Sequence, residues 1–343
     1  KLKIIQAPNF SQFRHVFCGY LEKVFIAPSK TFDNVPGHFP IGFFVWRLGT
    51  DKCKYNATAE VYKSKNKKEA IKIGEKYLVN IDGTELINKW YSKYYKKEGE
   101  IGIMHVHGND FEQQNYIHIS SVDNHNHTTK VTELNIIPSC IYLSVRQCVE
   151  ATWLNDRDQF LYPNDGWQND LDFQSDCLAY TLFHGQKRIM YKLGTNHWIP
   201  FTEAEVDAKE KFSSHFMSDF IAGKVAPSKK ENTLFNNEIA TTTQPITFTP
   251  LAAEVMEAGR KLWYYYLHHK QDSTELYAND SINVNASFYD IRRYFQGTNP
   301  ATGKMNNDSP DEEYTRLLAD LRQKQRLLAK QIEEKVYLYG FLK

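Results

Sequence analysis

The sequence predicts an α/β amino-terminal part and a mostly α-helical carboxy-terminal part. Two observations lead to this prediction. The apolar run from Phe39 to Trp46 has the length and composition of a strand buried on both faces of an α/β sheet. Far along the chain, apolar residues recur at helical spacing between Tyr314 and Val336. The length of 343 residues is enough for two or three domains.

Residues 1–62 hold the predicted α/β elements. We expect a short strand over residues 2–5, a helix over 9–21, the apolar strand over 39–46 and another strand over 57–62. The segment before the apolar strand is rich in proline and other turn-forming residues. Because a strand-like run stands at the very start and the first residue is a lysine, we expect a fragment of a longer chain.

Residues 63–128 form a mixed α/β basic segment in this interpretation. Between positions 61 and 97 the sequence holds ten lysines against four acidic residues. We expect a helix over residues 84–95 and strands over 101–106 and 116–120. The polar stretch 121–129 is typical of an exposed loop, so we place a domain boundary there.

Residues 129–343 predict a mainly helical carboxy-terminal domain with a long loop over 224–247, where Pro, Ser, Asn and Thr accumulate. The last helix has the clearest boundaries. Ser309 suits the N-cap, Pro310 the first helical position and Glu312 the capping-box position. Further helices are expected over residues 141–149, 177–183, 212–221 and 251–268.

Composition excludes some classes of protein and leaves others open. The net charge of +1 gives no overall field that would require a nucleic acid, although a local patch could bind one. An aromatic content of 14% suits buried interfaces or base-stacking surfaces. Five cysteines without Cys-x-x-Cys spacing argue against a zinc site or disulfide framework and favour reduced thiols in a cytoplasmic protein. The chain has no apolar run of membrane-spanning length, so no membrane partner is expected.

Several segments together resemble a known family. The residues from Thr31 to Val35, followed by Phe39–Trp46, resemble the late catalytic-domain strand of adenine-N6 DNA methyltransferases of the large bacterial restriction-modification type. The downstream region of such methylases is similar to four further stretches, which are 153–160, 163–167, 283–292 and 335–342. The resemblance implies that residues 1–62 are the final strands of a Rossmann-like methyltransferase domain, followed by the mixed segment and a large helical domain.

Two family motifs are missing from this sequence. One is the Phe-x-Gly-x-Gly turn that holds S-adenosylmethionine, of which Phe17-Cys18-Gly19-Tyr20 keeps a single glycine. The other is the Asn/Asp-Pro-Pro-Tyr/Phe tetrapeptide that binds the amino group of the flipped adenine, and no two prolines are adjacent here. The resemblance therefore implies that catalytic residues and S-adenosylmethionine belong to an upstream catalytic half, that this chain holds neither, and that it is inactive alone.

Phe32 is the site residue that the resemblance carries over. In the family, a phenylalanine in the loop before the buried strand packs on the flipped adenine. Stacking suits this task because every base has a π-face, and one stacked base contributes about 1–3 kcal/mol. The alternative is that Phe32 only packs its loop onto the sheet.

Lysines interleaved with aromatic residues between positions 89 and 97 suggest contacts with double-stranded DNA, because lysines neutralise phosphates and rings pack on sugars or bases. The alternative is a solvated amphipathic helix whose aromatic face lies in the core. The DNA-binding candidates are Lys63, Lys65, Lys67, Lys68, Lys89, Trp90, Lys93, Tyr94, Lys96 and Lys97.

Other polar clusters have weaker interpretations. The acidic residues between Glu150 and Asp176 could bind Mg²⁺ for a nuclease, but such residues mostly form turns and helix caps. His105-x-His107 and His125-x-His127 lack further ligands with zinc-site spacing, so no metal site is predicted. The arginines of Tyr289-Asp290-Ile291-Arg292-Arg293 could reach DNA phosphates, or pair with Asp290.

The sequence thus predicts the carboxy-terminal, DNA-binding and target-recognition part of an S-adenosylmethionine-dependent adenine-N6 DNA methyltransferase. Its partners would be double-stranded DNA and the upstream catalytic half. A non-enzymatic protein-interaction module is the first alternative, and a metal-dependent nuclease domain is the second.

Overall fold

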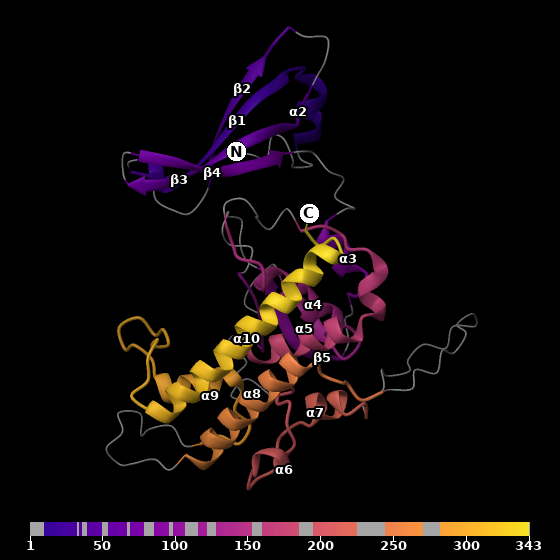
Figure 1. Ribbon diagram of the computed structural model, residues 1–343, viewed down its shortest axis with the longest axis vertical. Coiled ribbons are helices and arrows are strands. Elements are labelled where there is room, and N and C mark those ends of the chain that lie inside the picture. Colours follow the sequence, from indigo (N-terminus) through magenta and orange to yellow (C-terminus); the bar gives the residue numbers. More distant parts are fainter. Residues whose placement is uncertain are drawn as a thin grey trace, which may run out of the picture.

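The computed structural model describes thirteen stretches of the chain, and the fold is reported for these residues: 10–32, 34–35, 40–49, 54–66, 69–78, 86–95, 99–106, 116–121, 128–152, 160–184, 195–224, 244–269 and 282–342. Figure 1 shows a four-stranded sheet at one end and, next to it, a body of helices with a smaller sheet. Each part has its own hydrophobic cluster, and the two clusters share no residue. The described chain is therefore mixed α and β, with two small sheets and no closed barrel.

The four-stranded sheet has the order β2-β1-β3-β4. Its outer pairs, β1–β2 and β3–β4, are antiparallel, whereas the central pair, β1–β3, is parallel. A short helix and a 3₁₀ turn lie beside the first strand. The elements are α2 (Ser11–Val16), β1 (Tyr20–Pro28), η2 (Ser29–Thr31), β2 (Pro40–Arg47), β3 (Ala57–Asn66) and β4 (Glu69–Leu78).

The apolar run forms the expected strand, but the expected burial on both faces is wrong. Within the described part of the chain, β2 pairs only with β1, at one margin of the sheet. Phe44 and Trp46 pack against the cluster of buried residues, whereas Phe43 and Val45 point to the other face and are 49% and 43% exposed. The alternation of strand side chains thus separates one apolar run into a covered face and an open face.

Other expectations for this part need correction as well. The helix expected over residues 9–21 ends at Val16, and Tyr20 already begins β1. Residues 20–28 favour a strand because β-branched and aromatic side chains are frequent among them. Strand β4 was not expected, because its apolar residues alternate only briefly and lysines lie between them. A sheet with a single parallel pair does not show a Rossmann-like fold, and the strand expected over 2–5 lies outside the described residues.

The body combines a three-stranded antiparallel sheet, order β6-β5-β7, with helices that pack on it and on one another. Its hydrophobic cluster includes buried residues from both sides of the polar stretch 121–129, for example Met104 and Leu178. The elements are α3 (Ile87–Ser92), β5 (Glu100–Val106), β6 (Ile117–Ser120), β7 (Thr128–Thr132), α4 (Ile136–Gln147), η5 (Asp165–Asn169), α5 (Leu171–Phe183), α6 (Glu203–Val206), α7 (Phe216–Ile221), α8 (Pro250–His268), α9 (Phe288–Gln296) and α10 (Glu312–Leu338).

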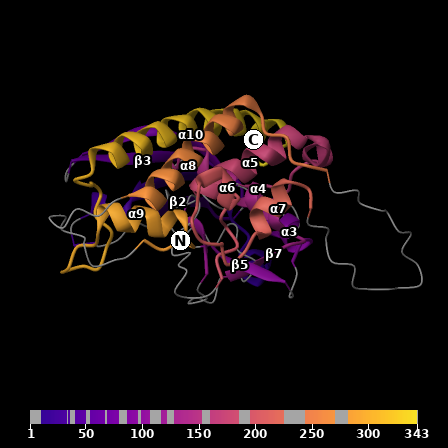
Figure 2. The ribbon, with the colours of Figure 1, turned by 90° about the horizontal axis from the view of Figure 1, so that it is seen from below.

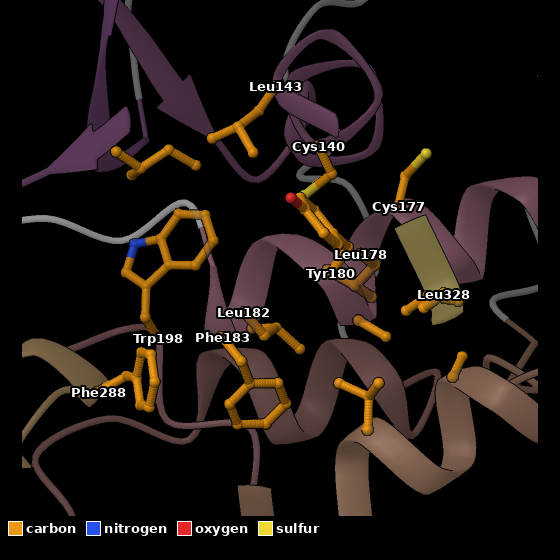
Figure 3. Packing of buried hydrophobic residues seen from close by; sticks show 14 of the residues in the cluster. Cys140, Leu143, Cys177, Leu178, Tyr180, Leu182, Phe183, Trp198, Phe288 and Leu328 are labelled. Atoms are coloured by element: carbon orange, nitrogen blue, oxygen red, sulfur yellow. The ribbon is translucent and has the colours of Figure 1, made fainter. Parts of the chain in front are cut away.

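Large rings fill the centre of the body (Figure 3). The rings of Phe183 and Phe288 meet edge to face at 6.0 Å. Trp198 is buried, and its Nε1 donates a hydrogen bond to the Ile101 carbonyl at 2.8 Å, which ties the small sheet to the helices. Gly259 lets α8 approach Phe183, because a Cβ at this position would lie 2.2 Å from the ring.

The last helix, α10, lies along the outside of the body in both views (Figures 1 and 2) and packs on α8 and α5. The predicted helix is present, but it begins at Glu312 and not at Pro310, because its cap is not the predicted one. The carboxylate of Asp311, two residues after Ser309, accepts a hydrogen bond from the Tyr314 amide at 2.7 Å, while Ser309 Oγ donates to the Phe295 carbonyl. Gly340, with φ of 74°, follows the helix end, as expected.

Two further findings concern the helices and the cysteines of the described residues. None of the helices in the described ranges has the length and apolar character needed to cross a membrane. Cys140, Cys148 and Cys177 are free thiols, as predicted, but Cys18 takes part in a disulfide bond, which corrects the expectation of reduced thiols throughout.

Candidate nucleic-acid interface

Phe32 lies at the end of the turn η2, beside the open face of the four-stranded sheet. Its ring is tilted against that of Phe43 on β2, with 5.9 Å between the ring centroids. The two side chains are 36% and 49% exposed. Phe32 therefore packs its turn onto the sheet, as the alternative interpretation expected, and its side chain stays partly exposed.

The open face extends from this ring pair across β1. Phe25 stands opposite Phe43 in the register of the two strands, and Lys23 stands opposite Val45. Arg47, at the end of β2, forms an ion pair with Glu22. A half-exposed aromatic surface with basic residues nearby is the kind of surface that binds unpaired bases.

Helix α3 and the two residues after it hold four of the predicted DNA-binding residues, and these differ in exposure. Trp90 is 1% exposed and meets the rings of Trp167 and Phe341 edge to face, each at 5.4 Å. Lys89 is exposed at the surface. Trp90 thus has no free ring surface for a base, which agrees with the alternative of an amphipathic helix with its aromatic face in the core.

Lys93 and Tyr94, the other two candidates, directly follow the end of α3, and Lys93 is exposed. Lys93 Nζ lies 4.8 Å from the centre of the Tyr162 ring, and a hydrogen bond with Tyr162 raises the pKa of Lys93. Tyr94 is half-buried and packs edge to face on Trp90 at 5.5 Å. Burial raises the pKa of the Tyr94 hydroxyl. With these raised pKa values, Lys93 is charged and Tyr94 is not ionised at neutral pH.

The remaining basic candidates do not join α3. Lys63 and Lys65 are exposed on β3, in the part of the chain that has the other hydrophobic cluster, and Lys65 pairs with Glu69 at 3.4 Å. Lys72 on β4 is held by two carboxylates, Glu60 and Glu75. Four further candidates, Lys67, Lys68, Lys96 and Lys97, lie outside the described residues.

The described acidic residues after Glu150 form hydrogen bonds within turns, at a helix cap and in the core. Asp165 accepts a hydrogen bond from Gln168 at 2.9 Å, and Asp170 caps α5 by accepting from the Phe173 amide. Asp176 is buried, and it accepts from Thr249 Oγ1 and Gln331 Nε2, each at 2.5 Å. No group of three or more His, Cys, Asp or Glu residues in the described stretches could hold a metal ion, and residues 153–159 lie outside them.

Of the four histidines in the two His-x-His pairs, the structure describes only His105. His105 stacks on His118 of the neighbouring strand β6, at 4.9 Å between ring centroids. His107, His125 and His127 fall outside the described residues.

The glycine-containing turn near the chain start does not fit a methyl donor. A Cβ on Gly19 would lie 2.7 Å from the ring of Phe17 and 3.1 Å from that of Trp46. The chain's own rings fill the space that a cradling glycine would leave open for a ligand, so none of the steps considered below passes through S-adenosylmethionine on this chain.

A set of basic residues that sequence reasoning missed lies on α10. Arg322, Arg326 and Lys330 are all exposed and follow one another at intervals of four residues; we call them the α10 basic row. The other three basic residues of this helix each have a carboxylate partner. The pairs are Arg316 with Glu313 at 2.6 Å, Lys324 with Asp320 at 2.9 Å, and Lys335 with Asp170 at 2.6 Å.

Near Arg322 lie Arg292 of α9 and His184, the residue after α5. Arg292 on α9 donates from Nε to Gln296 Oε1 at 3.3 Å, and the same oxygen accepts from the Tyr314 hydroxyl at 3.0 Å. Burial lowers the pKa of Arg292, and the nearby charge of Arg322 lowers it further.

His184, after the end of α5, stacks on Tyr180 with 4.7 Å between ring centroids. His184 is exposed at the surface, but nearby protein atoms reduce the solvation of its ring. This loss of solvation, together with the charges of Arg292 and Arg322, lowers the pKa of His184 to about 4. The imidazole is therefore neutral at pH 7, and the two arginines carry the charge.

The spacing of Arg322, Arg326 and Lys330 is visible in the sequence, but which basic residues of α10 are paired is not. The expected pair of Asp290 with an arginine is replaced by a helix cap, since the Asp290 carboxylate accepts from both the amide and the hydroxyl of Ser287 at 2.9 Å. Comparisons with protein families, with curated proteins and with solved structures found no match to this chain.

Proposed function

We propose that this chain is the DNA-binding and target-recognition part of an S-adenosylmethionine-dependent adenine-N6 DNA methyltransferase. The sequence resemblance supports this assignment along most of the chain. One structural observation supports it most directly, namely that Phe32 is partly exposed and rests on the partly exposed ring of Phe43. This is the surface that an adenine turned out of a duplex would need for stacking.

The chain's share of the reaction would be to hold DNA and the displaced base. Exposed lysines would neutralise phosphates, and the ring of Phe32 would lie against one face of the unpaired adenine. Phe43 would keep Phe32 in place from the side of the sheet. The upstream catalytic half would supply the donor and the tetrapeptide that holds the adenine amino group.

Binding of a duplex that contains one unpaired adenine tests this proposal. Replacing Phe32 by alanine removes a stacking contact of about 1–3 kcal/mol, so affinity for this duplex should fall roughly 5- to 150-fold. Affinity for the fully paired duplex should change little. Phe13→Ala is the matched control, because Phe13 is 42% exposed and stacks on another phenylalanine, Phe17, away from this surface. Equal effects of the two substitutions would contradict the role of Phe32.

Methyl transfer provides a separate test. Because the donor-binding turn and the tetrapeptide are absent from the sequence, the 343 residues alone should transfer no labelled methyl group to DNA. Addition of the upstream half should restore transfer. Methylation by the isolated chain would show that it contains a catalytic centre of its own, contrary to the proposal.

A protein-interaction module is the second candidate function. The observation in its favour is that Phe43 and Val45 give the open face an apolar surface. Partly exposed apolar groups of this kind also occur where another protein binds. If the chain has no affinity for DNA even at low salt, while Phe43→Ser abolishes association with the upstream half, this second function replaces the first.

A further inference from the structure

We propose that the α10 basic row, Arg322, Arg326 and Lys330, together with Arg292 of α9, is the surface that contacts the phosphate backbone of double-stranded DNA. This inference rests on the proposed function and assigns the backbone contact to residues that no sequence motif indicated. It places this contact on the outer side of α10 and away from the lysines of α3 and β3.

The pairing of charges on α10 is the first reason. Among the residues that the structure describes, Arg322, Arg326 and Lys330 have no carboxylate oxygen within 4.0 Å, whereas every other basic residue of this helix does. Charges that serve only stability and solubility would be expected to alternate with acidic partners along the helix. Three consecutive unpaired ones on the same face are free to bind an anion.

Their placement is the second reason. Four residues of α-helix rise about 6 Å, so the three side chains form a line that is about 12 Å long. Leu317, Leu321 and Leu328 of α10 are buried, whereas the row is exposed, and α10 runs along one edge of the body in Figure 2. A straight, exposed line of cations on a rigid helix suits the repeated charges of a duplex backbone.

The third reason is the convergence of Arg292 with Arg322. Arg292 is held by Gln296 and lies over the ring of Phe288, with its guanidinium carbon 5.9 Å from the ring centre. Within the described part of the chain it also has no carboxylate partner. Arg292 is half-buried, and the nearby positive charge of Arg322 repels it in the free protein. A phosphate between them would offset this repulsion.

Arginine also suits this ligand, because the planar guanidinium can donate two parallel hydrogen bonds to one phosphate. At the same interval of four residues, the buried Leu318 precedes the row and Glu334 follows it, so the contact would span little more than two helical turns. Each neutralised phosphate should add about −0.9 to the slope of log affinity against log salt concentration.

Salt dependence of DNA binding tests the proposal. In the full chain, Arg322→Ala with Arg326→Ala should make the slope less negative by about 1.8, so that a rise from 50 to 200 mM salt weakens binding about 12-fold less than in the unmodified chain. The matched control removes two paired charges from the same helix, through Arg316→Ala and Lys324→Ala. A charge-conserving variant, Arg322→Lys with Arg326→Lys, should keep most of the slope.

The outcomes separate this inference from the proposed function. If the unmodified chain binds DNA and both alanine pairs change the slope equally, net charge alone determines the salt dependence, and the proposed contact of the α10 basic row with DNA is wrong. If neither pair changes the slope, the backbone contact lies elsewhere, and the proposed function stands without the row. If the unmodified chain has no affinity at low salt, both fail. Thermal unfolding followed by circular dichroism checks that each variant is folded, and Arg→Gln pairs replace any alanine pair that is not.

Discussion

Lys335 Nζ donates a hydrogen bond to the Asp170 carboxylate at 2.6 Å, which joins the end of α10 to the start of α5 across 165 residues of sequence. The Tyr339 hydroxyl donates to the same oxygen, and the Phe173 amide donates to the other. Burial alone would raise the pKa of Asp170, but these hydrogen bonds and the charge of Lys335 lower it below its ordinary value of 3.8.

This lowered pKa predicts a loss of stability in acid. Because the carboxyl ionises more readily in the folded chain, its contribution is fully present above pH 4 and is lost as pH falls through the folded pKa. Asp170→Asn, which can still cap α5, should lower the free energy of unfolding at pH 7 by about 1.5–3 kcal/mol. Urea unfolding should show this difference shrinking below pH 4. A difference that is the same at pH 7 and pH 3 would contradict the explanation.

Substitutions at two neighbouring positions of α3 should distinguish a role in stability from a role in DNA binding. Trp90 fills the core, so Trp90→Ala should lower the free energy of unfolding by about 3–5 kcal/mol. Lys89→Ala, at an exposed position one residue away, should change it by less than about 0.5 kcal/mol. Denaturant unfolding measures both. If Trp90→Ala instead leaves stability unchanged and weakens DNA binding, the ring contacts the ligand and the core placement is wrong.

The close approach of Gly259 to Phe183 predicts that even a methyl group is harmful there. Gly259→Ala should destabilise the protein by about 1–3 kcal/mol through overpacking, although alanine is the better helix former by about 1 kcal/mol. Phe183→Leu removes part of the ring and should restore some stability in the Gly259→Ala background. Thermal unfolding of the two single variants and the double variant checks this coupling; additive effects would rule it out.

The three free thiols should resist alkylation in the folded protein. Burial raises the pKa of Cys140 to about 12 and raises those of Cys148 and Cys177 well above the ordinary value of 9.0. At pH 8 these groups are therefore thiols, and the thiolate that reacts with iodoacetamide is scarce. Mass spectrometry of tryptic peptides should find them unmodified until denaturant is added. Rapid labelling of Cys177 without denaturant would mean that the α4–α5 contact opens readily.

The spacing of apolar residues predicted those helices and strands whose own sequence has a regular apolar pattern. The helices expected over 251–268 and at the end of the chain correspond to α8 and α10, and the apolar run corresponds to β2 within one residue. The burial of that run could not be predicted, because which face of a strand is covered depends on its neighbours in the sheet. Asp311 and not Ser309 caps α10, because the Ser309 hydroxyl donates a hydrogen bond to the Phe295 carbonyl of a neighbouring segment.

The candidate site shows the same limit. The sequence places Phe32 before the strand and shows an interval of four residues between Arg322 and Arg326, but it does not show that Phe43 supports the first ring. Nor does it reveal that Glu313 and Asp320 neutralise other basic residues of α10 and leave these two unpaired. Partner choice among charges is a tertiary property, and residue spacing along one helix does not determine it.

The separation of the two hydrophobic clusters has a consequence for how the molecule loses its structure. The cluster of the four-stranded sheet is much the smaller of the two, and small cores protect a fold only marginally. This sheet should therefore open first as a cooperative unit of its own, while the body stays intact. Warming would then abolish the proposed base stacking at Phe32 before it disturbs the α10 basic row.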